Sequence, residues 1–158
     1  MKKFKRKIFG TKVTLFADKS RAETFKYKSF RDEFKGDNIK EELSYHLYPE
    51  RYIDDSLTRE LLRSSDSRAI LLVHGGILNR EWVYEDNTFF GKKYIPIQNW
   101  INKYDGKYDD LFILACGGNC EIKSKKSIVI HAKEDFSLDE LARHQIKMHV
   151  YIPRKGYI

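Results

Sequence analysis

The chain has 158 residues, of which 41% are hydrophobic and 34% charged, and this predicts a single globular domain over residues 1–158 with its own core. No apolar stretch approaches the ~20 residues that span a bilayer, and no apolar segment of a signal peptide follows the basic start. We therefore expect a cytoplasmic protein that does not contact membranes. Lysine and arginine number 30 against 23 acidic residues, a net charge of +7, which favours acidic partners in general and does not identify the fold.

The positive charge is concentrated in the N-terminal segment 1–10, with a second cluster at Lys123, Lys125 and Lys126. The simplest interpretation of these basic residues is that they are solvated lysine side chains and a basic N-terminal tail. Nucleic-acid binding is an alternative that we do not favour, because the chain contains no recognised nucleic-acid motif. The two cysteines, Cys116 and Cys120, do not form a disulfide framework.

The first predicted element is a strand over residues 12–17, preceded by a hairpin that turns at Gly10. Segment 24–30 fits a strand or a helix equally well. One helix is predicted after Asp37, and another begins at residue 55 or 56. Three leucines are expected on the inward face of this second helix: Leu57, Leu61 and Leu62.

A buried strand follows over residues 69–73. Segments 81–84 and 88–90 flank residues 85–87 and suggest a small hairpin that turns there. Pro96 suits the first turn of a helix, which Asp105-Gly106 ends. The apolar residues of this helix have helical spacing: Ile97, Trp100, Ile101 and Tyr104.

The last part of the chain contains three predicted strands, over residues 111–115, 127–130 and 148–152. Between the last two, Ser137 and Glu140 form a capping box that begins a helix. Strands that alternate with helices predict an α/β fold, a three-layer α/β/α sandwich around a mainly parallel sheet.

Two of the predicted strands end in chemically active residues. His74-Gly75 follows the apolar run 69–73, and Cys116-Gly117 follows the run 111–115. Ligands of parallel sheets bind beyond the carboxyl ends of the strands, so a base and a thiol arrive at one edge if the strands are neighbours. His131 follows its own predicted strand and is an alternative base.

A thiol becomes a strong nucleophile when an imidazole accepts its proton. Backbone amides must then meet the oxyanion that develops on the attacked carbonyl. Gly75 and Gly117 suit that role because glycine allows close approach of the backbone, and the amide of Cys116 suits it as well. This chemistry needs no cofactor and no metal.

The segment from Ala69 to Gly118 resembles the caspase-like cysteine peptidases, a superfamily that includes caspases, metacaspases, legumains, gingipains and CHAT domains. The matching residues are Leu71-Leu72-Val73-His74-Gly75 and Phe112-Ile113-Leu114-Ala115-Cys116-Gly117, and the cysteine follows the histidine by 42 positions (116 − 74). Position 114 is Leu where caspases have Gln. The resemblance implies a caspase-like fold and an endopeptidase in which Cys116 attacks a peptide carbonyl and His74 protonates the leaving amine. It also implies that the amides of Gly75 and Cys116 bind the oxyanion.

The expected partners are a peptide or protein substrate and a regulatory protein. Charged residues near the edge suggest opposite preferences: Glu121, Glu134 and Asp135 would favour a basic substrate residue, and Lys123, Lys125 and Lys126 an acidic one. From a different class, the chain could be a non-catalytic scaffold or binding module that uses its basic surface for nucleic acid or an acidic protein.

The sequence is compatible with three other kinds of site. Cys116 and Cys120 could join one histidine in a metal site (His74, His131, His144 or His149), although their spacing is unusual for zinc. Cys120 could be a resolving thiol for Cys116. The His-Gly-Gly sequence at residue 74 also resembles an esterase oxyanion loop, but no Gly-x-Ser-x-Gly elbow follows.

Overall fold

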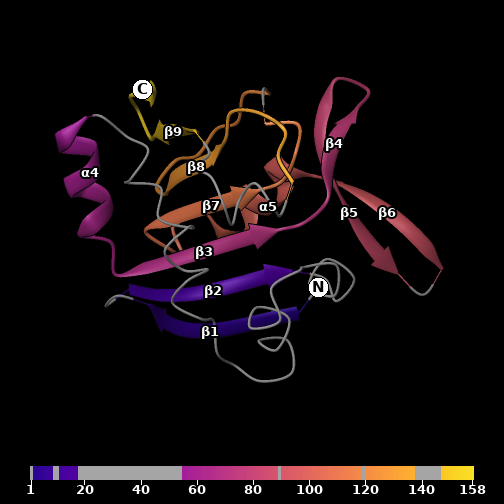
Figure 1. The fold of residues 1–158 in the computed structure, drawn as a ribbon, viewed down its shortest axis with the longest axis horizontal. Coiled ribbons are helices and arrows are strands. Elements are labelled where there is room, and N and C mark those ends of the chain that lie inside the picture. The colour runs from indigo at the N-terminus through magenta and orange to yellow at the C-terminus, as the bar shows by residue number, and fades with distance from the viewer. Residues whose placement is uncertain (1, 9–10, 18–54, 89, 119, 138–146) are drawn as a thin grey trace.

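A computed structural model describes residues 2–8, 11–17, 55–88, 90–118, 120–137 and 147–158 of the chain (Figure 1). Three predictions lie outside the described residues. These are the strand or helix over 24–30, the helix after Asp37, and the helix that the capping box would begin after Ser137.

The described strands form a seven-stranded mixed sheet and a separate three-stranded sheet. The order in the large sheet is β1 (Lys2–Ile8), β2 (Thr11–Ala17), β3 (Ser67–Leu72), β7 (Asp110–Leu114), β8 (Ile128–Ala132), β9 (Met148–Ile152) and β10 (Gly156–Tyr157). Strands β2, β3, β7 and β8 are parallel, whereas β1, β9 and β10 are antiparallel to their neighbours. The predicted α/β class is confirmed, but the sheet is parallel only in its centre and antiparallel at both margins.

The two central strands form as their sequences predict. Continuous apolar runs suit strands that are covered on both faces, and all residues of β7, and of β3 after Ser67, are buried. The polar exceptions are Arg68 and Asp110, which are Cα partners at the start of the two strands. The guanidinium binds both carboxylate oxygens, at 2.6 Å from Nε and 3.2 Å from Nη2. The two buried charges therefore satisfy each other.

Helix α4 (Ser56–Arg63) begins where predicted, because the Asp55 carboxylate accepts the backbone N–H groups of Leu57 and Thr58. The predicted inward face is wrong at two of its three leucines. Leu57 is 77% exposed and Leu61 46% exposed, and only Leu62 is buried. Because Thr58 is buried beside Leu62 on the next turn, the inward stripe is narrower and more polar than a leucine count predicts.

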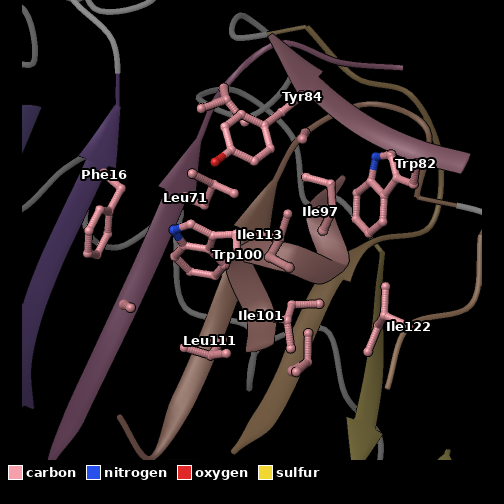
Figure 2. Packing of buried hydrophobic residues seen from close by; sticks show 14 residues of the cluster. Phe16, Leu71, Trp82, Tyr84, Ile97, Trp100, Ile101, Leu111, Ile113 and Ile122 are labelled. Carbon is pink, nitrogen blue, oxygen red and sulfur yellow. The ribbon is translucent and has the colours of Figure 1, made fainter. Parts of the chain in front are cut away.

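Helix α5 (Ile97–Tyr104) is confirmed in position and in its buried face. Ile97, Trp100 and Ile101 are buried and pack over Leu71 of β3 and Ile113 of β7 (Figure 2). Phe16 of β2 extends this core, with its ring edge-on to Trp100 at 5.6 Å between centroids. Within the described ranges, neither helix is long and apolar enough to cross a membrane.

The three-stranded antiparallel sheet projects beyond the carboxyl end of β3 (Figure 1). It consists of β4 (Gly75–Leu78), β5 (Glu81–Thr88) and β6 (Gly91–Pro96). The predicted turn at 85–87 is wrong, since these residues lie inside β5. The β4–β5 turn is instead at Asn79 and Arg80, whose positive φ angles of 52° and 64° form the left-handed turn that joins twisted strands.

Candidate active site

The structure brings the backbones of His74 and Cys116 together. Strands β3 and β7 are parallel neighbours, with Leu72 paired to Leu114, and the N–H of Val73 donates to the carbonyl of Leu114 at 3.3 Å. Two residues beyond this pair, in the same register, His74 follows β3 and Cys116 follows β7. His74 is exposed and Cys116 partly buried. A base and a thiol thus lie at the carboxyl edge of the parallel strands.

Gly75 makes this close approach sterically feasible. A Cβ at this position would collide with the carbonyl oxygen of Cys116 and would lie 2.8 Å from the Cβ of Ala115. The N–H of Glu85 donates to the carbonyl of His74 at 2.9 Å, and Gly75 is opposite Tyr84 in the next, non-hydrogen-bonded pair of the β4–β5 ladder. The N–H of Gly75 therefore points out of that ladder.

The peptide group between Cys116 and Gly117 is held at both ends. Its carbonyl accepts a hydrogen bond from Trp82 Nε1 at 2.6 Å, and its N–H donates to Asp135 Oδ1 at 2.8 Å. Gly117 has a φ of +92°, and a Cβ there would lie 2.9 Å from Trp82 Cδ1. Both the backbone angle and the indole thus require glycine at this position.

The Cys116 thiol contacts the segment that follows β8. Its Sγ–H donates to the carbonyl oxygen of Phe136 at 3.3 Å. Cys116 and Cys120 are both free thiols. In the part of the chain that the structure describes, no three His, Cys, Asp or Glu side chains gather as a metal site would require.

His131 differs from its predicted position, because it lies inside β8 rather than after it. The ring is 1% exposed, and both nitrogens are partnered: Nε2 with the Tyr157 hydroxyl at 2.8 Å, and Nδ1 with the Ala132 carbonyl at 3.2 Å. Since Tyr157 also accepts the N–H of Ile122, its hydroxyl proton is directed to Nε2 and the ring proton resides on Nδ1. Neither nitrogen is left to serve as a base for the thiol.

Burial is the main cause that lowers the pKa of His131 to about 4, so the ring is neutral at physiological pH. It packs against Trp82 and His149, each with 5.1 Å between ring centroids. A Cβ on Gly118 would lie 3.0 Å from His131 Nδ1. His131 and Trp82 therefore pack against the loop 116–118, at Gly118 and Gly117 respectively.

The charged residues that could select a substrate side chain do not form one group in the structure. All three acidic residues, Glu121, Glu134 and Asp135, are exposed, and the Asp135 carboxylate accepts the N–H of Gly117. Lys125 and Lys126 are also exposed, and their backbone N–H groups donate to the Asp105 carboxylate at the end of α5. Sequence reasoning missed Trp82 as a donor to the loop and Tyr157 as the partner of His131, because both contacts join segments far apart in the chain.

Comparisons with protein-family models, with curated proteins and with solved structures found no significant match to this chain.

Proposed function

We propose that the protein is a cysteine endopeptidase with Cys116 as nucleophile and His74 as general acid and base. The observation that carries this proposal is the contact of the His74-Gly75 backbone with that of Cys116 across two parallel strands. Such a contact delivers an exposed imidazole and a thiol to one sheet edge, where ligands of parallel sheets bind.

The chemistry assigned to these residues is balanced without a cofactor. The thiol proton passes to the His74 imidazole, and the sulfur adds to the peptide carbonyl. The imidazolium then gives this proton to the leaving amine as the carbon–nitrogen bond breaks. Water, deprotonated by the same imidazole, then attacks the thioester carbonyl; the carbon–sulfur bond breaks, the acyl group leaves as the acid, and the imidazolium returns its proton to the Cys116 sulfur. The amides of Gly75, Cys116 and Gly117 are the candidate donors to the oxyanion.

The order of elements supports the caspase-like interpretation, and the three-layer sandwich is proposed with it. A buried strand leads to His74-Gly75, a small antiparallel sheet and helix α5 follow, and a second buried strand leads to Cys116-Gly117. This is the succession on which the resemblance rests. The small sheet has three strands where the sequence suggests two.

Mass-spectrometric labelling with a panel of peptidyl electrophiles tests the proposal. Wild-type protein is compared with His74→Ala, Cys116→Ala and Cys120→Ala. We expect rapid labelling at Cys116, loss of that rate in His74→Ala, and no change in Cys120→Ala. Because His74 is exposed, its substitution is expected to leave the fold intact, which thermal unfolding checks.

Slow labelling that does not depend on His74 would contradict the proposal. The thiol would then be an ordinary one, and a non-catalytic scaffold or binding module would be the better interpretation. Hydrolysis of a fluorogenic peptide by Cys116→Ala would contradict it equally.

A further inference from the structure

The further inference concerns the two residues that contact the candidate nucleophile from the segment after β8, Asp135 and Phe136, which we call the strap. It occupies two groups that the proposed chemistry uses, the thiol and one of the three candidate oxyanion donors. The carboxylate of Asp135 accepts the N–H of Gly117, and the carbonyl of Phe136 accepts the Sγ–H of Cys116. The strap therefore lies on the amide and the thiol at the same time.

The contact on the amide has the chemistry of an oxyanion site. A negatively charged oxygen lies 2.8 Å from the N–H of Gly117, within the range of a donor to an oxyanion. Trp82 orients the same peptide group from the other side through its 2.6 Å bond to the carbonyl of Cys116. An incoming oxyanion and the Asp135 carboxylate would thus compete for one amide.

The contact on the thiol opposes its activation. A thiol that donates to a carbonyl is the neutral form, and a backbone carbonyl cannot accept the proton permanently. The proton must instead pass to an imidazole before the sulfur can attack. Phe136 is 7% exposed, so its side chain anchors the strap in the core while Asp135 remains at the surface.

We propose that the strap is an autoinhibitory contact, in which Asp135 acts as an internal competitor of the substrate at the amide of Gly117. The proposal rests on the proposed function for its meaning. Substrate binding requires release of the Asp135 carboxylate and of the Phe136 carbonyl, which frees the amide and the thiol together. Trp82 keeps the amide oriented while the occupant changes.

The test is the rate at which iodoacetamide alkylates Cys116, followed by peptide mapping so that Cys120 is counted separately. In Asp135→Ala we expect a rate about three- to tenfold higher than in wild type, the factor that one hydrogen bond of ordinary net strength supports. Glu134→Ala is the matched control, because it removes the same charge from the neighbouring exposed residue. It is expected to react at the wild-type rate.

An equal rate in Asp135→Ala and Glu134→Ala, or a slower rate in Asp135→Ala, would overturn the proposal. If Asp135→Ala does not fold, Asp135→Leu keeps the approximate size of the side chain and removes the acceptor of the Gly117 N–H. This variant should be alkylated faster than wild type, and the amide of Gly117 should exchange its hydrogen faster. An alkylation rate and an exchange rate equal to those of wild type would overturn the proposal.

The two proposals fail in different ways. A higher alkylation rate in Asp135→Ala that is unaffected by adding His74→Ala would support the strap and contradict the catalytic dyad. Labelling by peptidyl electrophiles that depends on His74 and is indifferent to Asp135→Ala would support the dyad and contradict the strap.

Discussion

His131 is expected to make the stability of the protein depend on pH. Its pKa is lowered from 6.5 to about 4 in the folded chain, chiefly by burial, whereas the unfolded chain binds the proton with the ordinary value. Acid therefore favours the unfolded state. The stabilising contribution is complete above pH 6.5 and is lost as the pH falls through about 4.

The size of the effect follows from the shift. Each pH unit between these two values costs about 1.4 kcal/mol, so the free energy of unfolding should fall by roughly 2.5 kcal/mol between about pH 7.5 and about pH 4.5. That loss is a large fraction of the stability of an ordinary domain. His149, across the strand pair, adds to it in the same direction, because burial and Lys133 lower its pKa as well.

The assay is urea unfolding at both pH values, followed by the fluorescence of the buried residues Trp82 and Trp100. His131→Asn should be less stable at neutral pH but should lose about 2.5 kcal/mol less than wild type on acidification. His149→Asn, the control, should keep most of the wild-type slope. If wild type and His131→Asn lost equal stability, His131 would not be the buried neutral group described above.

Two further predictions concern the strand ends and the buried ion pair. Gly75→Ala should destabilise the protein by about 1–3 kcal/mol and slow labelling of Cys116, because its Cβ meets backbone. Gly76→Ala, which has open space around its Cβ, should change stability by less than about 0.5 kcal/mol, and equal effects in chemical denaturation would contradict the close approach. Arg68→Met alone or Asp110→Leu alone should cost about 3–5 kcal/mol, and the double variant should recover most of that loss. Additive losses in the double-mutant cycle would show that the two charges are not coupled.

The parts of the fold that the sequence predicted are those with a strong local signal. Helix α5 has Pro96 before it, Gly106 after it and apolar residues at helical spacing, so its buried face was predictable. Strands β3 and β7 have continuous apolar runs. The β4–β5 turn has Asn79, which tolerates the left-handed region, but Arg80 where a glycine usually follows, so its turn signal is weak.

In the candidate site, too, some features were predictable from the sequence and others were not. Strand-end positions predicted where His74 and Cys116 would meet, because parallel strands end at a common edge. The donors and acceptors around them were not predictable. Trp82 is 34 residues from Cys116 and Asp135 is 18 residues from Gly117, and neither spacing has a local pattern. For His131, the observed strand ends at residue 132 rather than at the predicted residue 130, and this two-residue difference places the predicted edge residue inside the strand, where it is buried.

The ion pair between Arg68 and Asp110 has a consequence for the opposite end of its two strands. These residues are separated by 42 positions in the chain, the same separation as that of His74 and Cys116. A slip of β7 against β3 by one residue would leave two buried charges without partners and would also move the cysteine away from the histidine. The pair therefore fixes the register of the two strands, since the alignment that satisfies the charges is also the one that brings the His74-Gly75 backbone to that of Cys116.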